Sequence, residues 1–281
     1  MNTQPRISIV GYGRVGLPLA EVLVEKGFEV SGTVTSQEKC NKLNAAGMKT
    51  SVLKFLPEPE GDLDAAFNTD ILIVTVPPSR EPSAKKEPSA KKEPSVQFSV
   101  IMQRIADEAE SHSVQKVLLI STTSVYHQTG EVVREDDASH DSDAFLGISW
   151  LPIEELFTES ASFSMTVVRF SGLMGRGINP GLYFSGRELK GPDSLVNMIH
   201  VDDCVGIMTA IIEQEAWGEV FNGSADEHPA KRDFYTEACK VSGLPAPEFV
   251  NEASPYRIVN SDKVKSQLGY RFKFPDPMKG F

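Results

Sequence analysis

Positive charge is in short supply in this sequence. Its 28 Lys and Arg residues face 39 Asp and Glu, which gives a formal net charge of -11. A surface with this balance repels phosphate backbones and anionic lipid headgroups, so nucleic acid and membrane are excluded as main partners. A small anionic ligand is not excluded, because a glycine-rich turn can hold phosphate on an acidic protein.

Cysteine and long apolar runs are scarce as well. The three cysteines, Cys40, Cys204 and Cys239, are too few and too widely spaced for a disulfide framework or a metal site. We interpret them as small buried side chains and predict no bound metal. No apolar run is long enough to cross a bilayer, and the residues before Ile7 do not resemble a signal peptide. We therefore expect a cytoplasmic protein.

Hydrophobic residues, at 40%, are abundant enough for a packed core, and their pattern alternates between short apolar strands and amphipathic helices. Strands are predicted at 7–10, 28–34, 71–76, 116–121, 164–170 and 219–222, and helices at 15–26, 36–46, 96–111, 144–159, 202–213, 231–241 and 261–268. Such alternation is typical of βαβ units, so we predict an α/β fold with a doubly wound parallel sheet.

A glycine-rich turn joins the first predicted strand to the first helix. It consists of Gly11, Tyr12, Gly13, Arg14, Val15 and Gly16. In a strand–turn–helix context, the three glycines allow a tight turn, a close approach of the backbone to a pyrophosphate, and close helix–strand packing. The helix N-terminus adds N–H groups and a positive dipole end. The turn therefore predicts a Rossmann-type, NAD(P)-binding domain in which these six residues contact the cofactor.

The end of the second predicted strand indicates which dinucleotide is bound. NAD-binding chains usually place an acid there, on the ribose 2′-hydroxyl. Here Thr35 and Ser36 come first, and no acid occurs before Glu38. With Arg14 and Lys39 as sources of positive charge, we predict NADP, with NAD as the alternative. Val76 and Thr122, at the ends of two later strands, complete the predicted cofactor-binding residues.

A short repeat interrupts the pattern after the third predicted strand. Glu81-Pro82-Ser83-Ala84-Lys85-Lys86 recurs at 87–92, and a third copy starts at Glu93. A repeat this short cannot bury a core of its own, and its prolines and charges favour an extended segment. We predict a solvated surface loop at 80–95 that is dispensable for folding. A mobile flap over the cofactor is the alternative.

Four segments together resemble the short-chain dehydrogenase/reductase superfamily, in its NAD-dependent epimerase/dehydratase-like branch. They are Ile-Ser-Thr-Thr-Ser-Val-Tyr at 120–126, Val-Arg-Phe-Ser-Gly-Leu-Met-Gly at 168–175, Ile-His-Val-Asp-Asp at 199–203 and Gly-Glu-Val-Phe-Asn at 218–222. The resemblance implies a Rossmann domain at 1–172 plus 194–224 and a small C-terminal substrate lobe at 173–193 plus 225–281. It also implies a small-molecule substrate, polar or sugar-like, and a monomer or homodimer.

The superfamily's catalytic Tyr-x-x-x-Lys pair is missing. The resemblance places it near 147–155, yet no tyrosine occurs between Tyr126 and Tyr183. No lysine occurs between residues 116 and 190. We predict that Thr122 and Ser124 hold the substrate carbonyl, and that Tyr126 or His127 stands in as proton donor.

Other polar residues near these motifs have simpler interpretations. Asp202 or Asp203 is expected to cap a helix, with His200 before them as a hydrogen-bonded packing residue. Glu154 and Glu155 are expected on a solvated helix face.

Two functions of different classes follow from the sequence. The first is an NAD(P)-dependent oxidoreductase or epimerase/dehydratase-like enzyme with a non-standard active site. The second is a catalytically silent sensor that binds NADP and reports its state to a partner. Val15-Gly16-Leu17-Pro18-Leu19-Ala20 also resembles nucleotide-sugar dehydrogenases. Those chains are much longer and carry an acid after the second strand, which this chain lacks.

Overall fold

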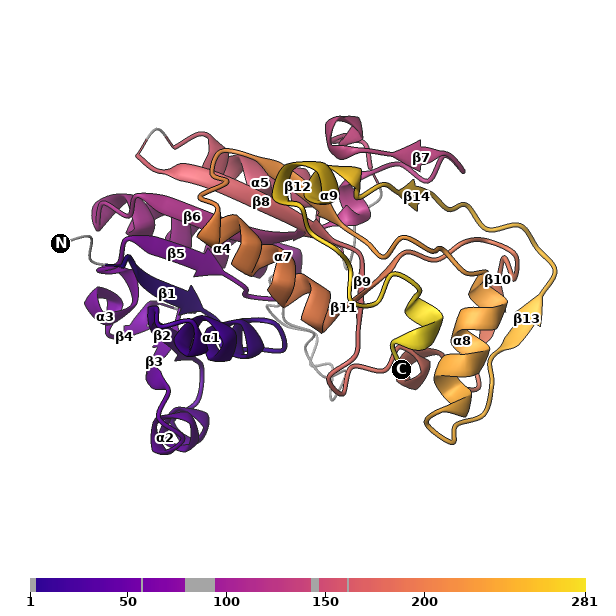
Figure 1. Cartoon of the computed structure of the whole chain (residues 1–281), viewed down its shortest axis with the longest axis horizontal. Coiled ribbons are helices and arrows are strands. Elements are labelled where there is room, and N and C mark those ends of the chain that lie inside the picture. The colour runs from indigo at the N-terminus through magenta and orange to yellow at the C-terminus, as the bar shows by residue number, and fades with distance from the viewer. Residues whose placement is uncertain (1–3, 57, 79–93, 143–146, 161) are drawn as a thin grey trace, which may run out of the picture. The chain divides into compact units, whose positions relative to one another are not determined.

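A computed structural model describes residues 4–56, 58–78, 94–142, 147–160 and 162–281 (Figure 1). Most of the repeat predicted as a loop, residues 80–93, lies outside these ranges, and α4 begins at Pro94.

The main sheet has eight strands in the order β12-β8-β6-β5-β1-β2-β3-β4. In chain order they are β1 (Arg6–Val10), β2 (Glu29–Val34), β3 (Lys49–Lys54), β4 (Glu60–Gly61), β5 (Ile71–Val74), β6 (Lys116–Thr122), β8 (Ser164–Phe170) and β12 (Val220–Gly223).

Helices and three short strand pairs complete the described secondary structure. The helices are α1 (Gly16–Glu25), α2 (Gln37–Ala45), α3 (Leu63–Phe67), α4 (Pro94–Ser111), α5 (Trp150–Thr158), α6 (Gly181–Phe184), α7 (Val201–Glu213), α8 (Lys231–Lys240) and α9 (Asp262–Leu268). The 3-10 turns are η1 (Thr123–Val125), η2 (Glu135–Asp137) and η3 (Pro277–Lys279). The paired short strands are β9 (Gly172–Met174) with β11 (Met198–His200), β10 (Glu188–Lys190) with β13 (Glu248–Val250), and β7 (Val132–Val133) with β14 (Ile258–Val259).

The order of the strands produces a reversal of winding beside β1. This strand pairs in parallel with β2 on one side and with β5 on the other. The chain first winds outward through β2 to β3 and then returns to build β5 and β6 on the opposite side. In open parallel sheets, ligands bind at the carboxyl ends of the strands where the order reverses. The arrangement confirms the predicted Rossmann-type α/β fold and puts Gly11 at the reversal.

Contacts within the chain define two compact units whose segments are interleaved in sequence. The first unit comprises 1–120, 144–167 and 217–219, and the second comprises 121–143, 168–216 and 220–281. These boundaries separate regions of dense internal packing. They differ from the sequence-based division into a cofactor domain and a substrate lobe, which remains a prediction about function.

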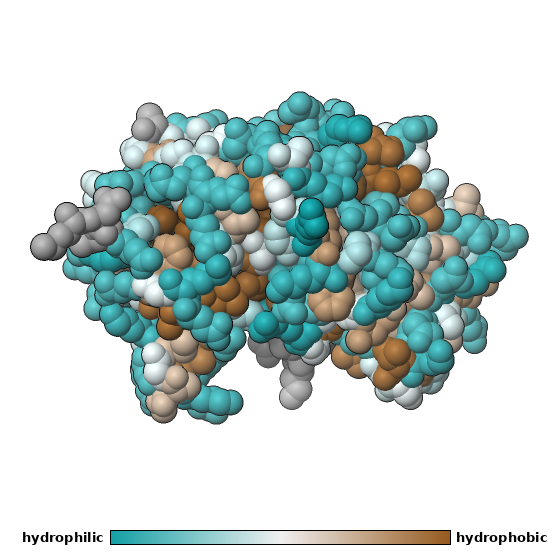
Figure 2. Space-filling view, viewed as in Figure 1, coloured by the Kyte–Doolittle hydropathy of each residue, from teal (hydrophilic) through white to brown (hydrophobic). Residues whose placement is uncertain are grey.

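Each unit has its own apolar core. In the first, α1 buries Leu19, Ala20 and Leu23, and every residue of β5 is buried. In the second, the side chains of Phe221 and Phe234 are fully buried. The face shown in Figure 2 is covered mainly by hydrophilic side chains, as the acidic composition leads one to expect. The three cysteines are buried and unpaired, in agreement with their predicted role as small core residues.

The described residues contain neither a helix suited to a membrane nor a cluster suited to a metal ion. No helix among them combines the length and apolar character that crossing a bilayer requires. No three His, Cys, Asp or Glu side chains in the described ranges are grouped so that they could hold a metal ion.

Candidate functional site

The glycine turn after β1 belongs to the first unit, and its three glycines have different surroundings. Gly11 has φ +105°, a conformation that side chains other than glycine rarely adopt. A Cβ at Gly16 would lie 2.3 Å from the Gly11 carbonyl oxygen, so the start of α1 packs directly on the turn. Gly13 is exposed, and the nearest atom to a Cβ there would be 3.9 Å away. The packing of this chain therefore does not by itself require glycine at 13.

Threonines from two neighbouring strands hold the turn in place. Thr75, just after β5, donates its hydroxyl to the Gly11 carbonyl oxygen at 2.5 Å. Thr33 in β2 accepts from the Gly11 amide through its hydroxyl at 3.2 Å, and from the Tyr12 amide through its carbonyl at 2.7 Å. The sequence motifs do not single out these threonines. The available signal was a hydroxyl residue near the carboxyl end of each strand that flanks β1.

Tyr12 points into the protein rather than away from the turn. Only 1% of Tyr12 is exposed, and a Cβ at Gly32 would lie 2.1 Å from its ring. Burial raises the pKa of the Tyr12 phenol, whose oxygen has no hydrogen-bond partner among the described residues. The predicted contact of Tyr12 with a cofactor therefore rests on its backbone.

The segment after β2 presents hydroxyl and cationic groups. Thr35, Ser36 and Lys39 are exposed. Ser36 caps α2 by accepting from the Lys39 amide at 3.4 Å. The Lys39 ammonium reaches back to the glycine turn and donates to the Tyr12 carbonyl oxygen at 2.5 Å. This bond places a positive charge beside the turn, on which Arg14 is exposed as well.

These features fit the phosphates of a dinucleotide. The N-terminus of α1 has no side-chain cap and no acid in its first turn, so its dipole and N–H groups are not offset by a local carboxylate. Val76, two residues beyond the end of β5, is half-buried. No feature of the described turn opposes a pyrophosphate over Gly13.

The predicted catalytic residues lie at the carboxyl end of β6 and just after it, and they belong to the second unit. Thr122 is half-buried and accepts from the Ser124 amide at 3.3 Å. Ser124 is buried, and its hydroxyl has no partner among the described residues. His127 is exposed. An unsatisfied buried hydroxyl is uncommon in proteins.

Tyr126 differs from its neighbours because it is part of a buried hydrogen-bond network. Its side chain is fully buried, and the phenol donates to the Asn222 side-chain oxygen at 2.5 Å. It also accepts from the Arg169 guanidinium at 3.0 Å. Burial raises the pKa of Tyr126 to about 12. These contacts favour a role in positioning the segment after β6, and they leave His127 as the accessible proton donor of the two.

Helix α5 covers the positions where the superfamily's Tyr and Lys would stand, and it contains neither residue. One prediction about this helix is wrong. Glu154 does not lie on a solvated face, because its residue exposure is only 3%. The helix buries the face that carries Ile153 and Phe157, and Glu154 lies on that same face.

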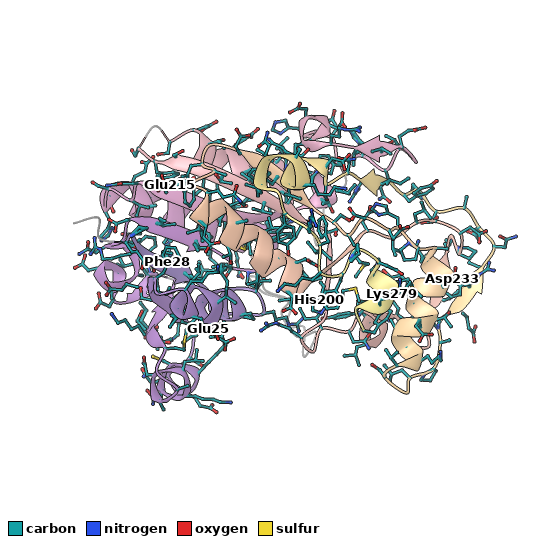
Figure 3. The ribbon with its side chains drawn as sticks, in the orientation of Figure 1. Glu25, Phe28, His200, Glu215, Asp233 and Lys279 are labelled. Carbon is teal, nitrogen blue, oxygen red and sulfur yellow. The ribbon has the colours of Figure 1, made fainter. Side chains whose placement is uncertain are left out.

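The start of α7 also corrects a prediction. Neither Asp202 nor Asp203 caps this helix; the cap is His200, which is labelled in Figure 3. Its Nδ1 accepts from the Asp202 amide at 3.0 Å. Burial lowers the pKa of His200, which favours the neutral ring that such a cap requires. Asp203 is fully buried, and its carboxylate accepts from the Tyr270 hydroxyl and from two backbone amides at 273 and 274, at 2.6 to 3.1 Å.

Comparison with known proteins agrees with this architecture. Residues 6–101 match the family described as NADP oxidoreductase, coenzyme F420-dependent. Protein YeeZ of Escherichia coli (strain K12) is 28% identical over 278 residues, which cover 97% of each chain.

Two solved structures share the fold. A short-chain dehydrogenase/reductase superfamily protein from Agrobacterium tumefaciens, with bound NAD, is 18% identical with a TM-score of 0.73, over 97% of this chain and 94% of that one. UDP-glucuronic acid 4-epimerase from Bacillus cereus, in complex with NAD, is 19% identical with a TM-score of 0.73, over 98% and 96%. The resemblance inferred from the sequence motifs is thus confirmed at the level of the fold.

Proposed function

We propose that this chain binds NADP(H) through the glycine turn. The supporting observation is the contrast among the three glycines: the chain's own packing accounts for Gly11 and Gly16 but places nothing against Gly13. A glycine at position 13 is explained if a ligand such as a pyrophosphate lies close against the backbone of the turn. The preference for NADP over NAD rests on Arg14 and Lys39 beside the turn and on the exposed hydroxyls at 35 and 36.

We further propose that the protein is an oxidoreductase or epimerase/dehydratase-like enzyme acting on a small polar or sugar-like substrate. A bound nicotinamide supplies or accepts a hydride in such enzymes. The hydroxyl groups of Thr122 and Ser124 hold the substrate oxygen by hydrogen bonds. His127, whose side chain is exposed, exchanges the proton. The superfamily's Tyr and Lys take no part, because α5 carries neither.

A second function is a sensor that binds NADP without turnover. The observation in its favour is again α5, where buried Glu154 stands among the positions from which the superfamily's Tyr and Lys are missing. The two functions share the cofactor and differ in hydride transfer. They are distinguished by whether bound NADPH is oxidised when carbonyl compounds are added.

The cofactor proposal is tested by calorimetric titration of NADPH into the wild type and into Gly13→Asp. We expect the variant to lose measurable binding, because its carboxylate blocks and repels the pyrophosphate. Asn68→Asp is the matched control. It adds the same charge at an exposed residue beside Arg6, at the opposite end of β1. Wild-type affinity in Gly13→Asp would refute the proposed site, whereas equal loss in both variants would indicate a general charge effect.

A further inference from the structure

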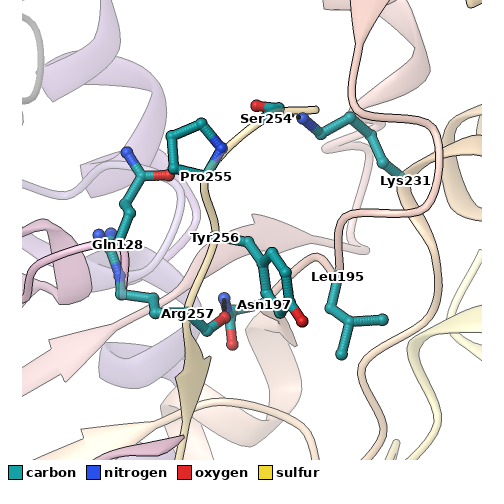
Figure 4. A pocket seen from close by; sticks show the side chains of 8 residues that line it. All are labelled: Gln128, Leu195, Asn197, Lys231, Ser254, Pro255, Tyr256 and Arg257. Carbon is teal, nitrogen blue, oxygen red and sulfur yellow. Dashed lines mark hydrogen bonds between the residues drawn. The ribbon is translucent and has the colours of Figure 1, made fainter. Parts of the chain in front are cut away.

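A polar cavity of about 160 Å³ lies within the second unit (Figure 4). Its polar lining consists of Gln128, Asn197, Lys231, Ser254, Tyr256 and Arg257, and one leucine and one proline complete the wall. Two of these residues are cationic and none is acidic. In a chain with a net charge of -11, such a lining stands out as a local concentration of positive charge.

The two cations are held by the backbone around the cavity. Lys231, the first residue of α8, donates its ammonium to the carbonyl oxygen of residue 190 at 3.0 Å and to the Ser254 hydroxyl at 3.3 Å. No carboxylate pairs with Lys231 in the part of the chain that the structure describes. The Arg257 guanidinium donates to the carbonyl oxygen of Tyr126 at 2.7 Å. Figure 4 shows Lys231 and Arg257 on opposite sides of the cavity, with Tyr256 between them.

The other polar groups of the cavity have two roles: some bond to the surrounding backbone, and one is available to a ligand. Asn197 belongs to the scaffold, since it donates to the Arg257 carbonyl at 2.9 Å and accepts from the Val259 amide at 2.8 Å. The Tyr256 phenol has no hydrogen bond within the described residues and offers a donor. The cavity therefore presents two hydrogen-bonded cations and a neutral donor, which suit a charged acceptor better than a neutral one.

We propose that this cavity binds a compact anionic group, a carboxylate or a phosphate. Partial burial lowers the pKa of Lys231, and a bound anion would offset that cost by pairing with the ammonium. The volume is well below the roughly 300–1,000 Å³ of pockets that enclose drug-sized ligands. The cavity therefore takes one anionic group of a molecule, and the remainder of that molecule extends beyond it.

The position in the chain connects this cavity to the proposed reaction. Gln128 in its wall directly follows His127, the proposed proton donor, in the segment after β6. Resting on the proposed function, the inference names the substrate class: a small carbonyl or hydroxy compound that carries a carboxylate or phosphate. The anionic group would anchor the substrate while the segment from 122 to 127 contacts the reacting end.

The test is calorimetric titration of the full-length chain with inorganic phosphate and, separately, with malonate, in chloride buffer at constant ionic strength. We expect saturable binding of at least one anion, weakened about tenfold or more in Lys231→Met and in Arg257→Gln, because each removes a charge-assisted bond. Lys240→Met is the matched control. It removes one positive charge from the other end of α8 and should bind as the wild type does. Lys231→Arg should retain most of the affinity.

The outcomes separate this inference from the cofactor proposal. Binding of phosphate alone identifies a phosphate subsite, and binding of malonate alone identifies a carboxylate subsite. No saturable binding of either anion to the wild type would overturn the inference, as would equal losses in Lys231→Met and Lys240→Met. Gly13→Asp should lose NADPH and keep the anion. If Arg257→Gln fails to fold by circular dichroism, Lys231→Met and Tyr256→Phe decide the matter.

Discussion

The roles of single residues in the glycine turn could be predicted from the sequence to different degrees. The pattern of three glycines identified the turn. Only the structure shows that the backbone conformation requires glycine at Gly11 and that close packing requires it at Gly16. Tyr12 was grouped with the cofactor contacts because it lies inside the motif. Sequence spacing could not reveal that its ring packs over Gly32, since that contact joins β1's turn to a residue twenty positions away.

Arg14 provides the test of cofactor preference at this scale. Arg14→Ala should weaken NADPH binding more than NADH binding, by about 1.5–3 kcal/mol if a charge-assisted hydrogen bond to the 2′-phosphate is lost. Calorimetry with the two cofactors measures the difference directly. Lys49→Ala is the control, because it removes an exposed cation that pairs with Glu29 on the neighbouring strand. Equal losses of NADPH and NADH in Arg14→Ala would contradict the predicted preference for NADP.

At the scale of elements, hydrophobic periodicity predicted most strands and helices of the first unit and missed β3, β4 and α3. The sequence of β3, Lys-Thr-Ser-Val-Leu-Lys, is largely polar, and only one of its residues is buried. It becomes a strand through parallel pairing with β2, a tertiary effect that local pattern does not encode. The helix predicted at 144–159 begins at Trp150 within the described residues, so Pro152 stands near its N-terminus. It lies in the first turn, where a helix residue has no amide partner to lose.

The pairs formed by β9 with β11 and by β7 with β14 show the same limitation. Each pair joins strands of two or three residues that are far apart in the chain. Segments this short have no usable periodicity, so the apolar pattern did not predict β7 or β11. The helix cap at His200 was missed for a related reason. Aspartate is the preferred capping residue, but residue type does not reveal that the local turn directs a His200 ring nitrogen toward the Asp202 amide.

Asp203 provides the test at the scale of elements, because it joins α7 to the segment at 270–274. Asp203→Ala leaves the half-buried Tyr270 hydroxyl and two backbone amides without their acceptor. We expect the free energy of unfolding to fall by about 2–5 kcal/mol, measured by urea denaturation. Asp202→Ala, whose carboxylate pairs with Arg176 nearer the surface, should cost no more than about 1 kcal/mol. Similar losses in the two variants would show that the buried carboxylate is not a special anchor. Faster amide exchange at 273 and 274 in Asp203→Ala alone would support it.

At the scale of the whole molecule, the fold was predictable and the chemistry only partly so. Alternating strands and helices sufficed for the parallel sheet, because that architecture is imposed by burial on both faces. The candidate catalytic residues came from motifs, and motifs do not report exposure. Tyr126 and His127 are neighbours in sequence, yet one is fully buried in a hydrogen-bond network and the other is exposed.

Catalysis is the property that depends on the whole molecule. Without the Tyr-x-x-x-Lys pair, we expect slow NADPH oxidation, because general acid–base catalysis contributes roughly 10²–10⁴-fold. Single-turnover assays with aldehydes, ketones and nucleotide sugars should show residual activity that falls in Thr122→Ala and in His127→Ala. Tyr126→Phe should act mainly through stability, since its phenol contacts Asn222 and Arg169. Turnover above about 1 s⁻¹, within the ordinary enzyme range, that is unaffected by all three changes would place the active site elsewhere.

The interleaving of the two units has a consequence for how this protein can be cut and recombined. The chain leaves the first unit after residue 120, returns to it at 144–167, and returns again at 217–219. No single break in the gene therefore yields two fragments that each contain a whole unit. A chimera that grafts another protein's second unit onto this first unit needs five coordinated junctions, one at each crossing. A library of single-crossover hybrids should accordingly yield few soluble products, whichever relative supplies the other half.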